Sequence, residues 1–215
     1  KITAKTKAIV LINPNNPTGA VYSADCLEKI VRFAEKHRLI VYSDEIYDKI
    51  LYDTEEHISP AAIAEDTLVV TMSGLSKSHR IAGFRAGWLV LSGNRDMAQD
   101  YIEGLELLSS MRLCSNVPSQ YAIKTALEGN QCINDLVKPG GRLFEQRNTA
   151  YKLLNEIPGV SCTKAKGAFY CFPRLDTKRF SIYDDHKFAM DLLKTKRILI
   201  VHGTGFNWIH PDNFR

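Results

Sequence analysis

Three short apolar runs, each followed at once by a polar loop, most strongly constrain the fold of this chain. The runs lie at residues 8–12, 39–42 and 68–72 and are rich in valine, isoleucine and leucine. Between the first two, apolar residues recur at helical spacing after Ser23, which predicts a helix to about residue 37. Strands that are apolar along their whole length and alternate with a helix are typical of a parallel sheet covered on both faces. We therefore expect an α/β fold.

A helical middle follows these runs. The apolar run at 88–91 predicts a fourth strand, whose direction the sequence leaves open. Proline and glycine at 139–141 separate a helix that starts near Pro118 from another over 142–154. A helix is also expected over 94–111, and its apolar face consists of Met97, Tyr101, Leu105 and Leu108.

The last third of the chain has a different pattern. After a turn at 157–159, a helix is expected near 185–194 among short strands, which are expected at 160–163, 168–172 and 198–201. This α+β pattern predicts a second, smaller domain. We expect residues 1–130 to belong to a large domain, 131–157 to form a connecting helical segment, and 158–215 to belong to the small domain.

Composition argues against several classes of function. The net charge is only +4 over 215 residues and the basic residues are dispersed, so we expect no nucleic-acid partner. No apolar run approaches the roughly 18 to 20 residues that a membrane span needs. The five cysteines form no C-x-x-C pair and no zinc-spaced cluster with histidine, so we expect reduced thiols, no metal site and a cytoplasmic location. Because the chain begins at a lysine, we expect a piece of a longer protein.

Each of the first three predicted strands ends in a loop with an unusual polar residue. These residues are Asn16, Asp44 and Lys77. Because the carboxyl ends of neighbouring parallel strands share one edge, the three side chains could meet at one ligand. Together with the phenol of Tyr47 and the guanidinium of Arg85, they suit pyridoxal 5'-phosphate (PLP), which forms a Schiff base with a lysine. An Asx turn at Asn16, a capping role for Asp44 and a core position for Tyr47 are alternatives that the sequence leaves open.

Several motifs resemble, in order and spacing, those of class I/II aminotransferases of PLP fold type I. They are NPNNPTG at 13–19, SDEIY at 43–47, SK at 76–77, GFRAG at 83–87, KGAFY at 166–170 and HGTGF at 202–206. Four segments resemble the alanine aminotransferase (glutamate–pyruvate) branch in particular. They are DKILY (48–52), GLSK (74–77), YIEGL (101–105) and PGGR (139–142). The resemblance covers the whole chain. It implies the later part of a large domain with a mostly parallel sheet in a three-layer α/β/α arrangement, followed by part of a small α+β domain.

The resemblance implies three catalytic residues. Lys77 would be the Schiff-base lysine and would move a proton once the substrate has displaced it from the cofactor. Asp44 would pair with the N–H of the pyridine ring, because a nearby carboxylate favours the protonated, electron-accepting form of that ring. Tyr47 would hydrogen bond to the phenolic oxygen of the cofactor.

Further residues are implied to bind the cofactor or the substrate. Asn16 would also contact the phenolic oxygen and would lie beside the substrate. Arg85 would contact the phosphate, with Ser76 as a weaker candidate for the same role. Arg215 would hold the substrate carboxylate by a two-pronged contact that lysine cannot supply. One departure concerns position 74, where this chain has Gly74 in place of the hydroxyl that many relatives carry.

The resemblance implies transamination between L-alanine and 2-oxoglutarate, giving pyruvate and L-glutamate, in a full-length homodimer. The 215 residues alone are expected to be inactive, because in the family an N-terminal region and a second subunit complete the site. Alternatives that the motifs leave open are an aspartate or aromatic aminotransferase, a C–S β-lyase, and a catalytically silent relative. A nucleotide-binding P-loop is disfavoured, because GLSKS at 74–78 lacks the required glycines.

Overall fold

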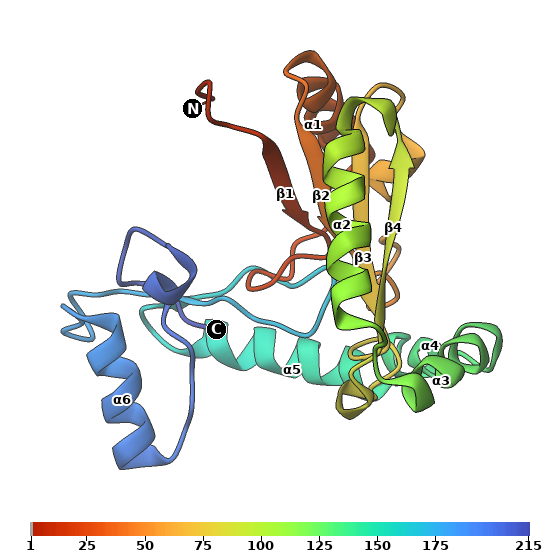
Figure 1. The fold of residues 1–215 in the computed structure, drawn as a ribbon. Helices are drawn as coiled ribbons and strands as arrows, with labels where there is room; N and C mark the ends of the chain where they lie inside the picture. Colours follow the sequence, from red (N-terminus) through yellow and green to blue (C-terminus); the bar gives the residue numbers. More distant parts are fainter. Residues whose placement is uncertain (1) are drawn as a thin grey trace. The chain divides into compact units, whose positions relative to one another are not determined.

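The computed structural model describes residues 2–215, which fall into two compact units (Figure 1). The first unit runs to Pro14 and continues with Val21–Leu51 and Glu56–Asn134. The second unit consists of Asn15–Ala20, Tyr52–Glu55 and Asp135–Arg215. The predicted domain limits near residues 130 and 157 stay a prediction.

A four-stranded sheet forms the centre of the first unit. Its strands, in spatial order, are β1 (Ala8–Ile12), β2 (Ile40–Asp44), β3 (Leu68–Gly74) and β4 (Gly87–Gly93). The first three run parallel, and β4 runs antiparallel to β3, which settles the direction that the sequence left open. The register places Ile12, Asp44 and Met72 level with one another, so the carboxyl ends of the parallel strands share one edge. The predicted α/β fold with a mostly parallel sheet is confirmed.

One face of this sheet is covered by α1 (Ala24–Lys36). The hydroxyl of Ser23 accepts a hydrogen bond from the backbone N–H of Cys26 at 3.3 Å and caps the helix as its position predicts. The side chains of Leu27 and Ala34 are fully buried in one cluster with Val41 of β2, and this cluster also includes β1 and β3 residues. Burial of this apolar surface is what holds the helix on the sheet.

The opposite face of the sheet is covered by α2 (Gln99–Arg112), which lies alongside the strands in Figure 1. Met97 and Tyr101 pack against Leu68 and Val70, which confirms the start of the predicted apolar face. The prediction is wrong for the end of that face, because Leu108 is 64% exposed. The buried cluster on this side of the sheet includes only Tyr101 of the helix, and Leu107 and Leu108 remain exposed.

Other helices lie outside these layers. They are α3 (Val117–Glu128), α4 (Ile133–Val137), α5 (Arg142–Glu156) and α6 (Asp185–Lys196). The helices near 117, 142 and 185 are as predicted, whereas α4 was not predicted. Short 3-10 turns occur at Pro60–Ala62, Ala82–Phe84, Asp96–Ala98 and Gly203–Phe206. No helix within residues 2–215 combines the length and the apolar character needed to cross a membrane.

The second unit contains one small antiparallel ribbon, β5 (Val160–Ser161) with β6 (Arg174–Leu175). The strand expected at 168–172 is wrong, because Ala168 adopts a left-handed conformation with φ +55° and turns the chain. The strand expected at 198–201 is also wrong. Only Val201 pairs there, through two backbone hydrogen bonds of 2.8 Å with Arg215, while Leu199 is 75% exposed.

Candidate active site

The loops that follow β2 and β3 are tied together in the first unit. The carboxylate of Asp44 is half-buried, and its Oδ1 accepts a hydrogen bond from the backbone N–H of Ile46 at 3.1 Å. The buried hydroxyl of Ser78 donates to the carbonyl of Ile46 at 3.5 Å and to the carboxylate of Asp48 at 3.2 Å. These contacts orient Asp44 and fix the loop that carries Lys77 against the loop that carries Asp44.

The loop around Lys77 is a closed turn. The backbone N–H of Leu75 donates to Ala86 at 3.0 Å, and the N–H of Ile81 donates back to the carbonyl of Leu75 at 3.3 Å. The carbonyl of Lys77 accepts from the N–H of Arg80 at 3.0 Å. Lys77 and the neighbouring Ser76 are both half-buried. Backbone bonds therefore hold the lysine at a fixed point beyond the end of β3.

Gly74, the last residue of β3, stands where the resemblance implies a hydroxyl. It pairs with Gly87 across β3 and β4, and a Cβ added to it would lie 2.8 Å from the carbonyl oxygen of Ala86 and 3.0 Å from the Cα of Gly87. Real Cβ atoms do not approach backbone that closely. The two strands pass too near each other for any side chain at position 74 unless the backbone shifts.

Arg85 follows the 3-10 turn Ala82–Phe84 in a left-handed conformation with φ +53°. Its Nη1 donates to the carbonyl of Ala82 at 2.8 Å, and the residue is exposed. The carbonyl of Phe84 accepts a bond from Asn116 at 3.3 Å. The guanidinium is therefore anchored on its own turn, just before β4 begins.

A buried carboxylate lies next to Asp44 in the chain. Glu45 accepts hydrogen bonds from Ser43 at 2.8 Å and Ser59 at 2.7 Å, and its Oε2 lies 2.9 Å from Nε2 of His57. Burial alone would raise the pKa of Glu45, but the bonds from His57, Ser59 and Ser43 outweigh it and keep that pKa below its ordinary value. This network braces the loop that contains Tyr47, itself only 3% exposed.

Two other predicted residues meet in the second unit. Nη1 of Arg215 donates to Oδ1 of Asn16 at 2.9 Å, although the two residues are 199 positions apart. The guanidinium of Arg215 lies 5.0 Å from the ring centres of both Tyr170 and Phe206. Its backbone is fixed by the pair of hydrogen bonds to Val201. The arginine is thus placed by an amide, two aromatic faces and a backbone bridge.

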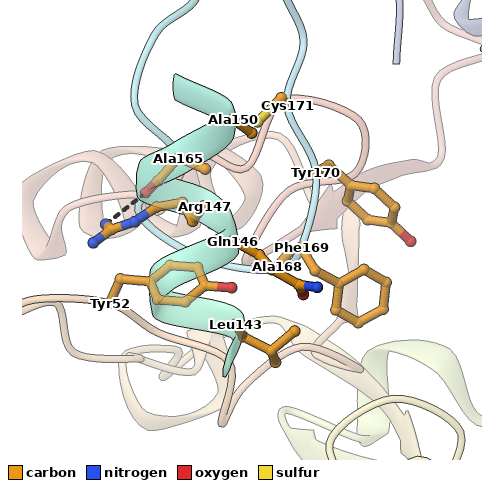
Figure 2. Close-up of a pocket in the computed structure, with 10 residues that line it drawn as sticks. All are labelled: Tyr52, Leu143, Gln146, Arg147, Ala150, Ala165, Ala168, Phe169, Tyr170 and Cys171. Carbon is orange, nitrogen blue, oxygen red and sulfur yellow. Dashed lines mark hydrogen bonds between the residues drawn. The ribbon is translucent and has the colours of Figure 1, made fainter. Parts of the chain in front are cut away.

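The second unit also contains a cavity of about 190 Å³ beside α5, shown in Figure 2. Arg147, which is 5% exposed, lies in its wall and donates to both carboxylate oxygens of Asp53 at 2.7 and 3.1 Å and to the carbonyl of Ala165 at 3.1 Å. Its guanidinium stacks 4.5 Å from the ring centre of Tyr52. The hydrogen bonds from Arg147 hold the pKa of Asp53 below its ordinary value.

The predicted site residues therefore form two groups. Asp44, Tyr47, Ser76, Lys77 and Arg85 belong to the loops around the sheet of the first unit. The amide–guanidinium pair described above belongs to the second unit.

The family profile described as "Aminotransferase class I and II" matches residues 1–215, the whole of the chain. This chain belongs to the class I and II aminotransferase family. The expected family resemblance is thereby confirmed.

Curated relatives of this aminotransferase chain point to one branch of the family. It is 59% identical over 215 residues to the glutamate-pyruvate aminotransferase AlaA of Escherichia coli K12, covering all of this chain and 53% of that protein. It is 58% identical to the alanine aminotransferase of Mycobacterium tuberculosis H37Rv, covering all of this chain and 50% of that protein. The chain spans about half the length of the curated relatives that it matches.

Solved structures agree with this assignment. An aminotransferase from Escherichia coli matches with a TM-score of 0.97 at 59% identity, covering all of this chain and 53% of that one. An alanine aminotransferase from Pyrococcus furiosus matches with a TM-score of 0.91 at 40% identity, again with 53% of that chain covered. The aminotransferase fold is therefore shown over the whole chain.

The sequence of this aminotransferase chain did not predict several residues that lie around the site. Tyr170 and Phe206 are the last residues of KGAFY and HGTGF, so these motifs could have indicated them. Ser78 directly follows Lys77 and could have been suspected as a brace. No sequence signal indicates the pair of Arg147 with Asp53, which are 94 positions apart.

Proposed function

We propose that the full-length protein transfers an amino group between L-alanine and 2-oxoglutarate, giving pyruvate and L-glutamate, with PLP as its cofactor. One observation carries the proposal, namely the 58–59% identity, over all 215 residues, to relatives named glutamate-pyruvate or alanine aminotransferases. A cytoplasmic homodimer is part of the same proposal. So is the division into a large domain (1–130), a connecting segment (131–157) and a small domain (158–215).

The side chains of the first unit suit PLP. Asp44 supplies a carboxylate, oriented by the N–H of Ile46, that would favour a protonated ring nitrogen. Ser76 and Arg85 supply a hydroxyl and a cation for the phosphate group. When bound, PLP provides an electron sink for the electron pair left on the substrate Cα. Lys77, on the closed turn after β3, supplies the amine to which the cofactor binds.

Two residues bear on the position of the cofactor ring. Tyr47, buried beside the braced carboxylate of Glu45, would donate to the phenolic oxygen of PLP. Asn16 would reach the same oxygen while its Oδ1 holds Arg215. A second donor on one oxygen stabilises the negative charge there more than a single donor does.

The amine of Lys77 would move the proton of the substrate. With PLP bound, Lys77 would accept the proton that leaves Cα of the substrate and would act as the acid that gives a proton back later in the reaction. Its residue is half-buried, and backbone bonds in the closed turn hold the point from which this side chain starts. Fixed geometry of this kind lowers the entropic part of the barrier.

Arg215 would orient the substrate. Its guanidinium can grip a carboxylate with two parallel N–H donors, and Asn16 leaves it one Nη group and its Nε for that purpose. The rings of Tyr170 and Phe206 hold the guanidinium plane in place. With the carboxylate fixed, the Cα–H bond of the amino acid has a defined direction.

The full-length protein, supplied with PLP, tests the proposal. We expect a visible absorption band that borohydride abolishes and a reduced cofactor label on Lys77, together with pyruvate formation from L-alanine and 2-oxoglutarate. A label on any other lysine would refute the role of Lys77. Turnover of aspartate or an aromatic amino acid without pyruvate formation would replace the substrate assignment and leave the cofactor assignment intact.

A further inference from the structure

The loop formed by residues 201–206 contacts Arg215 at both of its ends. At one end, the backbone of Val201 exchanges two hydrogen bonds of 2.8 Å with the backbone of Arg215. At the other end, the ring centre of Phe206 lies 5.0 Å from the guanidinium of Arg215. A shift of this loop would therefore move two of the contacts that place Arg215.

The backbone of this loop is closely packed. A Cβ added to Gly203 would lie 2.6 Å from the carbonyl oxygen of Asn213, so no larger residue fits there unless the backbone shifts. Nδ1 of His202 accepts a hydrogen bond from the backbone N–H of Gly205 at 3.1 Å and caps the 3-10 turn. The loop is thus a compact turn that lies directly against the segment leading to Arg215.

Asp185, the first residue of α6, holds the middle of this loop. Its Oδ2 accepts from the backbone N–H of Thr204 at 2.9 Å, and its Oδ1 accepts from the hydroxyl of Thr204 at 2.8 Å. The residue is only 3% exposed. Burial alone would raise the pKa of Asp185, but the two bonds from Thr204 outweigh it and keep that pKa below its ordinary value. Both bonds are therefore made to a charged carboxylate, which strengthens them.

The start of α6 does not itself require these bonds. The preceding residue, Asp184, is the N-cap, and its Oδ1 accepts from the backbone N–H of Lys187 at 2.8 Å. Among the hydrogen bonds and ion pairs of residues 2–215, those of Asp184 stay within α6. An acidic residue in the first turn also suits the helix dipole, but it can do so while exposed to solvent. The burial of Asp185 and the use of both its oxygens are explained by the loop.

We propose that Asp185 is a positioning residue for the substrate carboxylate and acts through Thr204 on Arg215. The inference rests on the proposed function, because it requires that Arg215 binds the α-carboxylate of the substrate. By fixing the loop, Asp185 keeps Phe206 against the guanidinium and Val201 paired with the backbone of Arg215. The guanidinium then keeps the direction that a two-pronged contact needs. Asp185 does not contact the substrate itself.

The test compares Asp185→Asn with Asp184→Asn in the full-length protein supplied with PLP. An asparagine at position 185 offers one acceptor oxygen in place of two and carries no charge, so one bond to Thr204 is lost and the other is weakened. We expect KM for alanine to rise about fivefold and kcat to stay within about twofold of the unaltered protein. Asp184→Asn makes the same change in charge one residue away and keeps a capping oxygen, so its KM should stay within about twofold.

A second variant tests the path through Thr204. Thr204→Val removes the hydroxyl but keeps the backbone N–H and the shape of the side chain, so KM should rise about two- to threefold. In the double variant with Asp185→Asn, the rise should be smaller than the product of the two single effects, because both substitutions remove the same bond. Effects that multiply fully would show that the two residues act separately and would overturn the proposal.

A binding measurement separates this inference from the proposed function. Propionate has the carboxylate of alanine without its amino group, and ligand-observed NMR gives its dissociation constant without turnover. This constant should rise about fivefold in Asp185→Asn and about two- to threefold in Thr204→Val, which decides the case if Asp185→Asn does not fold. If the unaltered protein forms no pyruvate, the proposed function fails while these constants still test Asp185. Equal changes in Asp185→Asn and Asp184→Asn, a fall confined to kcat, or no propionate binding to the unaltered protein would overturn the inference.

Discussion

The two groups of proposed site residues are built in different ways. In the first unit, Asp44 and Lys77 are placed by backbone: a parallel register levels the strand ends, and turns close the loops behind them. In the second unit, two bonds to Val201 hold the backbone of Arg215, and side chains place its guanidinium through one bond to Asn16 and two aromatic faces. Positions fixed by a sheet tolerate changes in neighbouring side chains, whereas positions fixed by side chains do not. We therefore expect substitutions of Lys77 to slow the chemical step and substitutions of Arg215 to weaken substrate binding.

The largest expected effect is on the backbone-fixed group. Lys77→Ala should lower kcat for pyruvate formation by about 10³-fold, near 4 kcal/mol, because it removes the group that moves the proton. Steady-state assays of the full-length protein measure this, with circular dichroism as a check on folding. Lys29→Ala is the matched control, since that lysine is 75% exposed on α1 and pairs only with Asp25 among the contacts seen in residues 2–215. Retention of more than about a tenth of wild-type kcat by Lys77→Ala would exclude the proposed role.

The next effect probes how the second unit is held together. Asp53→Ala leaves the buried guanidinium of Arg147 without its carboxylate and should lower the free energy of unfolding by about 3 kcal/mol. Urea denaturation measures the change. The exposed pair of Arg32 with Glu65 provides the control, because Glu65→Ala should cost less than about 1 kcal/mol. Equal losses for the two variants would mean that the burial of Arg147 has no energetic consequence.

A smaller effect is expected on binding. Arg215→Ala should raise KM for alanine about 10- to 100-fold, because hydrogen bonds to a charged group contribute about 1.5–3 kcal/mol. Arg215→Lys keeps the charge without the forked geometry and should recover only part of the loss. The comparison of the two groups predicts that KM changes more than kcat. A fall confined to kcat, with KM unchanged, would contradict it.

The smallest effect concerns the carboxylate network next to Asp44. The folded-state pKa of Glu45 lies below its unfolded value of about 4.3, so the network stabilises the fold above that pH and the contribution is lost as pH falls through the folded pKa. Glu45→Gln should lower stability at pH 7 by about 1 kcal/mol and flatten the acid limb of a stability–pH curve. Unfolding midpoints between pH 3 and pH 7 provide the measurement. An unchanged acid limb would show that other carboxylates govern it.

Local patterns in the sequence predict most of the first unit. The strands end where apolar runs meet polar loops, and Ser23 caps α1 because its hydroxyl needs only the next turn of backbone. Local sequence patterns do not predict contacts between segments that are far apart in the chain. The pairs Arg147 with Asp53 and Arg215 with Asn16 are separated by 94 and 199 positions. The family resemblance assigned Arg215 and Asn16 to the substrate but predicted no bond between them.

The wrong predictions have the same origin. Residues 168–172 have an apolar composition that suits a strand, but the left-handed backbone at Ala168 turns them into a connection instead. Helix α2 was given an apolar face along its full length, although the sheet cluster touches only its start and leaves Leu108 exposed. In both cases the apolar composition of the segment did not decide its structure.

The close pairing of Gly74 with Gly87 sets a limit on protein engineering. A hydroxyl at position 74, introduced to add a phosphate contact, would require the strands β3 and β4 to separate near Ala86. That movement would displace the turn that carries Lys77, since Leu75 is bonded to the same carbonyl. Directed evolution of this chain toward tighter cofactor retention should therefore find solutions at Ser73 or Ser76 before it finds one at position 74.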